Sequence, residues 1–88
     1  MRITFDTSKD QMNSEKRGVS LSLAALIDWF AVMAKPDRRR DYGEVREIGY
    51  AVVDQRLYCV VFTQRGESMP IISLRRANIR EVRDYAKA

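Results

Sequence analysis

Hydrophobic and polar residues form short blocks along this 88-residue chain, and the blocks predict seven secondary-structure elements. Residues 2–5 alternate between the two kinds, which is the period of a half-buried strand. The next block is polar, and Asp6 or Thr7 can accept the free amides at the start of a helix over about residues 8–16. Gly18 can adopt the left-handed conformation that ends helices, so this helix should stop there.

A strongly apolar block follows the glycine. Ser20 can cap a helix over about residues 21–34, in which Ser22 and Asp28 are the polar residues. A helix with no polar face needs cover on more than one side. We expect one side to pack on the sheet. The other side is either buried within the domain or covered by a second protein chain, and the sequence leaves both alternatives open.

The second half of the chain predicts an antiparallel meander. A charged loop over about residues 35–44 contains the triplet Arg38, Arg39 and Arg40, which is too polar to pack inside. Three apolar runs follow, and the connections between them are short enough for hairpins. The strands are expected at about 45–53, 56–64 and 68–74, with turns at 54–55 and 65–67.

The chain ends with a basic helix. Asn78 can accept the amide of residue 81 while Glu81 bonds back to residue 78, a capping-box spacing that starts a helix running to about Lys87. Cationic side chains recur at helical spacing and define one face of the helix. They are Arg76, Arg80, Arg83 and Lys87. Such a face is either a solvated surface or a site that holds phosphate.

Together these elements predict an α+β fold. The three hairpin-linked strands and the first strand would form a small antiparallel four-stranded sheet, with two N-terminal helices and one C-terminal helix. We expect residues 1–88 to form a single domain, because a chain this short hides only about 60–65% of its unfolded surface and has room for one core.

The charge balance favours a polyanionic partner. The chain has 16 basic and 12 acidic residues and a net charge of +4. Twelve of the sixteen cations are Arg, whose planar guanidinium makes two-pronged contacts with phosphate. The excess lies in residues 45–88, with eight basic and five acidic groups. This half is therefore expected to face nucleic acid.

The residue types present in the chain limit the reactions that it could catalyse. The chain has no histidine and one cysteine, Cys59, so a serine or cysteine triad, a zinc site or a disulfide within one chain is excluded. We expect no metal and no cofactor. RNA cleavage by its own 2′-hydroxyl needs neither, because arginines can neutralise the crowded phosphate. Glu44 would be the general base, and its alternative role is an exposed ion pair with Arg46. Tyr85 would be a second residue that transfers protons, and its alternative role is packing.

The cellular setting follows from absences in the sequence. The N-terminus lacks the apolar core of a signal peptide, and no run reaches the about 20 apolar residues that cross a bilayer. With Cys59 in an apolar run, these features predict a reducing, cytoplasmic setting without membrane contact.

Six short motifs, in order and at matching separations between Phe5 and Tyr85, resemble the BrnT toxins. The matching residues are Asp6, Lys9, Asn13, Lys16, Gly18, Val19 and Ser20; Ala24; Tyr42, Gly43, Glu44 and Arg46; Thr63, Arg65 and Gly66; Ile71, Ile72, Ser73, Arg75, Arg76 and Ala77; and Glu81 with Tyr85. The resemblance implies a fold similar to the RelE-like ribonucleases and an endoribonuclease that blocks translation. It also implies neutralisation by a cognate BrnA-type antitoxin, and binding of operator DNA only through the toxin–antitoxin complex.

The expected site combines this resemblance with the residue chemistry. The catalytic set is Lys16, Glu44, Arg46, Arg75 and Tyr85, and the RNA- and phosphate-binding set is Arg17, Arg65, Arg76, Arg80 and Arg83. The sequence departs from the usual family pattern in four places. Arg17 replaces a histidine, Pro70 an arginine and Val82 an arginine, and Gly49-Tyr50-Ala51 stands where the family has Ala-x-Gly. These departures favour the alternative function, a catalytically weakened or inactive nucleic-acid or protein binding module of the same fold.

Overall fold

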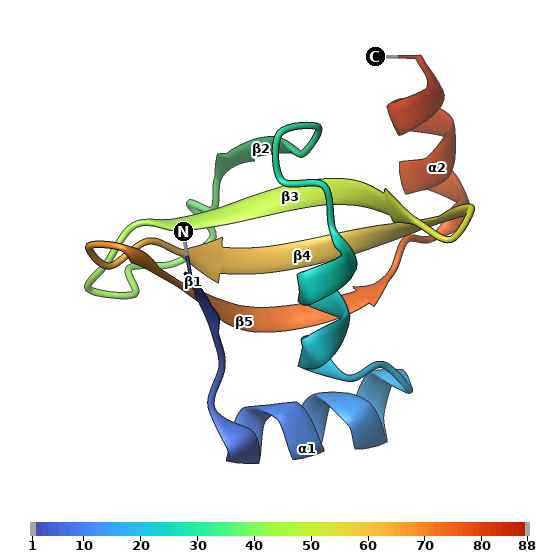
Figure 1. The fold of residues 1–88 in the computed structure, drawn as a ribbon. Helices are drawn as coiled ribbons and strands as arrows, with labels where there is room; N and C mark the ends of the chain where they lie inside the picture. The colour runs from blue at the N-terminus through green and yellow to red at the C-terminus, as the bar shows by residue number, and fades with distance from the viewer. Residues whose placement is uncertain (1, 88) are drawn as a thin grey trace.

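A five-stranded sheet forms the centre of the fold, in the strand order β1-β5-β4-β3-β2 (Figure 1). This computed structural model describes residues 2–87. The elements are β1 (Arg2–Thr4), α1 (Thr7–Arg17), the 3-10 helix η1 (Leu21–Leu26), β2 (Met33–Pro36), β3 (Arg46–Val53), β4 (Arg56–Thr63), β5 (Ser68–Arg76) and α2 (Ile79–Ala86).

The predicted fold class, α+β, is confirmed, and the sheet differs from the prediction in two details. Strands β3, β4 and β5 pair antiparallel, as expected for the meander, and β2 also pairs antiparallel with β3. Strand β1 runs parallel to β5, so the sheet is mixed. It has five strands because β2, which the sequence pattern did not predict, adds to the edge beside β3.

The predicted helix over residues 21–34 is wrong. A short 3-10 helix starts at the expected cap, Ser20, and ends at Leu26, after which Ile27 is extended. Asp28 then forms a turn, in which its side chain accepts from the amide of Phe30 and its carbonyl accepts from that of Ala31. These local bonds compete with helix continuation, which releases the following residues to pair with β3.

The segment between η1 and β2 packs closely on the sheet. Trp29 meets Phe62 of β4 edge-on, with ring centroids 5.0 Å apart. A Cβ atom on Gly49 of β3 would lie 2.6 Å from Cγ1 of Val32, so the approach of this segment requires glycine there. The apolar residues of the mispredicted helix are thus divided between the core and the surface, with Leu26 and Phe30 exposed.

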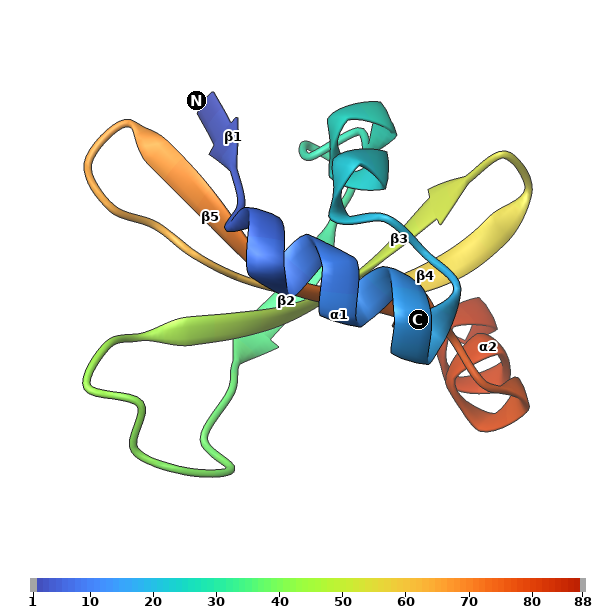
Figure 2. The ribbon, with the colours of Figure 1, turned by 90° about the horizontal axis from the view of Figure 1, so that it is seen from below.

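The two faces of the sheet have different roles. One face carries Val60 and Leu74 and packs against Leu21 and Ala24 of η1 to form the hydrophobic core. Helix η1 and helix α2 lie on opposite sides of the sheet (Figure 2), and the loop between β2 and β3 lies on the α2 side. The face away from the core therefore forms a surface bordered by α2 and this loop.

Several local predictions are confirmed. Asp6 caps α1 and Gly18 ends it with φ 69°. The full capping box of Asn78 and Glu81 starts α2. The first hairpin turn, Asp54-Gln55, has positive φ at both residues, as a two-residue turn of this kind requires. Each of these features depends on a few neighbouring residues.

A single side chain, Asn13 of α1, takes the place of a strand along part of β5. Strand β1 pairs only with residues 68–70 of β5. Further along, Asn13 Oδ1 accepts from the amide of Leu74 at 3.2 Å, and Nδ2 donates to its carbonyl at 2.7 Å. Nδ2 also donates to the carbonyl of Val19 at 2.8 Å. These bonds join α1, the following loop and β5 in a buried position.

We expect Asn13→Ala to lower the free energy of unfolding by about 2–3 kcal/mol, because it leaves buried backbone groups of Leu74 and Val19 without partners. Urea denaturation would measure the change. Gln11→Ala, an exposed substitution in the same helix, should stay within about 0.5 kcal/mol of wild type. Equal effects of the two variants would show that the side-chain bonds are not needed.

Candidate functional site

The sheet face on the α2 side carries a row of polar residues from three neighbouring strands. Register places Arg46 opposite Thr63, and Tyr50 opposite Cys59. Cys59 in turn lies opposite Arg75 of β5. Side chains at paired positions point to the same face of a sheet. We call this surface the polar face.

A cationic pocket of about 330 Å³ opens on the polar face. Its cations come from four separate segments of the chain, and Glu81 of α2 is its acidic residue. The cations are Arg17 at the end of α1, Lys35 of β2, Arg39 of the loop after β2, and Arg75 of β5. The fold thus brings together residues far apart in the sequence.

Arg75 is held in the pocket by a two-pronged ion pair with Glu81. Its two terminal nitrogens donate to Oε1 and Oε2 of Glu81 at 2.7 and 2.8 Å. Tyr50 donates to Oε2 at 2.8 Å. The bond from Arg75 lowers the pKa of Glu81 to about 2, and burial is the main cause that raises the pKa of Tyr50. Glu81 is therefore ionised and Tyr50 neutral at physiological pH.

Arg39 is also fixed, by a buried carboxylate. Its Nε and Nη2 both donate to Asp37 at 2.8 Å, and the hydroxyl of Tyr42 donates to the same carboxylate at 3.0 Å. The bond from Arg39 holds the pKa of Asp37 well below its usual range. The guanidinium of Arg46 stacks on the Tyr42 ring, 4.1 Å from its centroid. This network fastens the charged loop to the polar face.

Glu44 lies in a second cluster at the other end of the polar face. Its Oε1 accepts from Arg65 at 2.6 Å, and this bond lowers the pKa of Glu44. Among residues 2–87, its Oε2 and the Nε of Arg46 are buried and have no hydrogen-bond partner. Arg46 and Tyr50 are four residues apart on β3, which is about 13 Å. The structure therefore brings Glu44, Arg46 and Arg65 together, and separates them from Arg75.

The other expected site residues are more dispersed. Lys16 is exposed in the last turn of α1, beside Arg17. Tyr85 lines a hollow next to the cationic pocket, together with Tyr50 and Glu81. The remaining three arginines are exposed, with Arg76 at the end of β5 rather than on the helix. They are Arg76, Arg80 and Arg83.

Four residues of the pocket were not expected from the sequence as members of the site: Lys35, Arg39, Tyr50 and Glu81. Lys35 and Arg39 belong to a charged run that was assigned to the surface, and the unpredicted strand β2 brings them to the polar face. Glu81 was expected as a helix cap and as a residue of the family motif, and was not included in the expected site. Tyr50 could have been found, because alternation along β3 places it on the same face as Arg46.

The pocket contains one thiol, and the described residues include no cluster of metal-ligand side chains. Within residues 2–87, no group of three or more histidine, cysteine, aspartate or glutamate side chains could hold a metal ion. The pocket wall includes Cys59, whose buried position raises the pKa of its thiol.

Comparison with known families assigns the chain to a class. The profile described as "Ribonuclease toxin, BrnT, of type II toxin-antitoxin system" matches residues 5–81, which include every element of the polar face up to Glu81. The protein is thus a ribonuclease toxin of a type II toxin–antitoxin system. It belongs to the BrnT family. No individual curated protein matches the chain.

Family membership implies a cognate antitoxin as partner. Across the described part of the chain, none of the helices has the length and apolar character needed to span a membrane.

The ion pair of Glu81 should make stability depend on pH. Because its pKa is lower in the folded protein than the ordinary value of 4.5, its contribution is complete above about pH 4.5 and is lost as the pH falls toward 2. We expect wild type to lose more stability between pH 5 and pH 3 than Glu81→Gln does, measured by urea denaturation at each pH. Asp84→Asn, a change on the same helix, should behave like wild type.

Proposed function

We propose that this toxin cleaves RNA without a metal ion and thereby inhibits translation, and that the reaction takes place in the cationic pocket. The observation that carries the proposal is the two-pronged Arg75–Glu81 pair, which holds a guanidinium in a pocket that Arg17 and Lys35 also line. Cations that are in place before the reaction stabilise developing negative charge without reorganisation. The family assignment supports RNA as the substrate.

In the proposed reaction, the 2′-oxygen of a ribose forms a bond to the adjacent phosphorus and the bond from phosphorus to the 5′-oxygen breaks. Arg17 and Arg75 neutralise the charge of the five-coordinate phosphate. Lys35 protonates the departing 5′-oxygen, and the proton of the 2′-hydroxyl passes to water. Both oxygens of Glu81 already accept hydrogen bonds from Arg75, Asn78 and Tyr50, so Glu81 positions Arg75.

The second cluster has a different role in this proposal. Glu44, which the sequence suggested as the base, accepts a hydrogen bond from Arg65. It precedes β3 and lies at the opposite end of the polar face from Arg75. We assign Glu44, Arg46 and Arg65 to binding the RNA strand beyond the scissile phosphate. Lys16 and Tyr85 are proposed to contact RNA at the rim of the pocket, and the exposed arginines Arg76, Arg80 and Arg83 to attract it electrostatically.

The remaining elements of the proposal concern regulation. The cognate antitoxin neutralises the toxin, and the complex of the two binds operator DNA. The setting is the cytoplasm, where RNA, ribosomes and the antitoxin are present together.

Arg75→Ala should reduce kcat for RNA cleavage by about 10²–10³-fold, the usual effect of removing one donor to a developing oxyanion. Arg17→Ala should reduce it less, by about tenfold or more, and should fold normally, because no ion pair of Arg17 is found within residues 2–87. Cleavage of a short RNA by purified protein measures both. Arg83→Ala, an exposed change on α2, is the matched control and should mainly alter KM.

Two further results would change the assignment. If Glu44→Gln lowered kcat as much as Arg75→Ala while remaining folded by circular dichroism, the reaction centre would lie in the second cluster. If wild type bound RNA and left it intact, and its expression did not arrest growth, the protein would be the binding module that the departures at Arg17, Pro70 and Val82 favour.

A further inference from the structure

We infer that the outer edge of β2 is the docking site of an extended antitoxin segment, which adds to the sheet as a sixth strand. This inference rests on membership of a toxin–antitoxin family and deepens the proposed function by naming the surface through which the site is regulated. Strand β2 is the last strand of the sheet, so within residues 2–87 no strand lies beside its outer side.

The register shows which backbone groups are available at this edge. The amide of Asp37 donates to the carbonyl of Arg46, directly opposite, at 2.7 Å. In an antiparallel pair, bonded and non-bonded positions alternate. Met33 and Lys35 therefore bond to β3, and Ala34 directs its N–H and C=O outward. Pro36 also falls at an outward position, where its lack of an N–H breaks no bond within the sheet.

Hollows on both faces of the sheet adjoin this edge. On the core face, a hollow of about 630 Å³ is lined by Trp29, Phe30 and Phe62. On the polar face, a hollow of about 670 Å³ is lined by Ile48 and Tyr85, among others. Val32 and Ala34 line both hollows. Because side chains of a strand point alternately to the two faces, an added strand would direct apolar residues into each hollow in turn.

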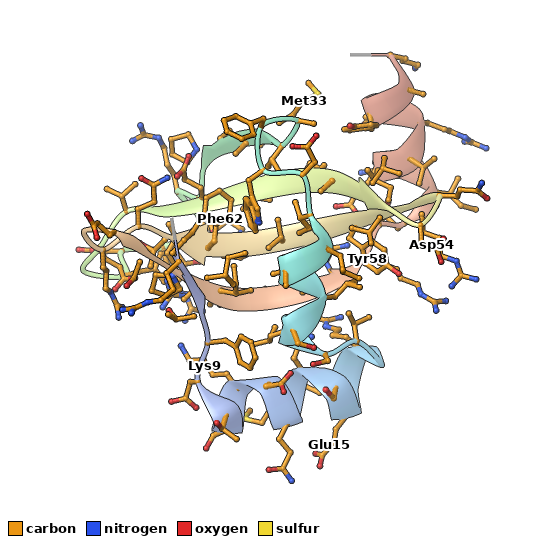
Figure 3. All side chains as sticks on the ribbon, viewed as in Figure 1. Lys9, Glu15, Met33, Asp54, Tyr58 and Phe62 are labelled. Carbon is orange, nitrogen blue, oxygen red and sulfur yellow. The ribbon has the colours of Figure 1, made fainter. Side chains whose placement is uncertain are left out.

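The exposed residues around the edge favour an apolar partner. Every residue of β2 is exposed, and Met33 projects from the outer edge of the sheet (Figure 3). Phe30, in the loop before β2, is fully exposed. Apolar side chains that are exposed together beside an open strand edge are typical of an interaction site.

The charges favour an acidic segment over a second copy of this chain. Lys35 lies on the edge strand, and the cationic pocket with Arg17, Arg39 and Arg75 adjoins it. A second copy would bring another Lys35 and another net charge of +4 to the same place. Lysine and proline on an edge strand also disfavour pairing between identical chains. An antitoxin segment with alternating apolar residues and a neighbouring carboxylate satisfies both the hollows and the cations.

Docking at this edge would inhibit the proposed reaction directly. Lys35, Ile48, Tyr50 and Glu81 line both the polar-face hollow and the cationic pocket. A side chain in the hollow would therefore lie beside the Arg75–Glu81 pair. The added strand would cover Lys35 and close the side of the pocket that faces β2, so that RNA could not enter there.

The test uses full-length toxin and its cognate antitoxin. Met33→Asp places a carboxylate at the apolar rim and should weaken antitoxin binding by about tenfold or more in Kd, measured by calorimetry. Val52→Asp is the matched control, because Val52 is exposed to almost the same extent (53% against 51%), lies on the neighbouring strand and lines neither hollow. It should leave Kd within about twofold of wild type.

Hydrogen exchange provides a second measurement that needs no variant. The amide of Ala34 should exchange quickly in the free toxin and be protected in the complex. Equal binding by Met33→Asp and Val52→Asp, or no added protection of Ala34, would overturn the inference. A toxin dimer that dissociates in Met33→Asp without the antitoxin would assign the edge to a second copy. Failure of RNA cleavage would reject the proposed reaction and leave these binding measurements intact.

Discussion

The carboxylate of Glu81 is the group on which the polar face depends. It accepts from Arg75 of β5, from Tyr50 of β3 and from the amide of Asn78 at the start of α2. Helix α2 has no buried residue, so apolar packing contributes little to its position. Two hydrogen bonds from Arg75, one from Tyr50 and one from Asn78 therefore place the helix and orient the guanidinium of Arg75. They also form one wall of the cationic pocket. A loss of this carboxylate would disturb structure and site together.

The parts of the fold that could be predicted from the sequence depend on neighbouring residues. The caps at Asp6, Gly18 and Asn78 and the turn at Asp54-Gln55 each require a side chain or a backbone conformation that a few residues specify. The strands of the meander have long apolar runs between clear turns. The prediction of a helix over residues 21–34 was wrong because hydrophobicity alone does not distinguish a helix from an extended segment. In addition, Asp28 forms a local turn that ends the helical conformation. Strand β2 exists because β3 offers it a partner.

The candidate site, like the fold, could be predicted from the sequence only in part. Residue types and motif order were sufficient to suggest a cationic, metal-independent centre and the toxin family. They could not show that Arg17 and Arg75 share a pocket while Glu44 lies with Arg65, since these groupings come from strand register and from the path of the loop after β2. Lys35 entered the site only through a strand that was not predicted. Spatial grouping of charges is a property of the tertiary fold.

The hydrogen bonds of Asn13 can be made only by an amide. Its nitrogen donates to two carbonyl oxygens and its oxygen accepts from one amide, so the two atoms are not interchangeable. Deamidation to aspartate would replace the nitrogen with a second acceptor that faces the carbonyls of Val19 and Leu74, and would turn attraction into repulsion. Loss of this one nitrogen would then weaken the attachment of α1, which carries Arg17, to the strand that carries Arg75.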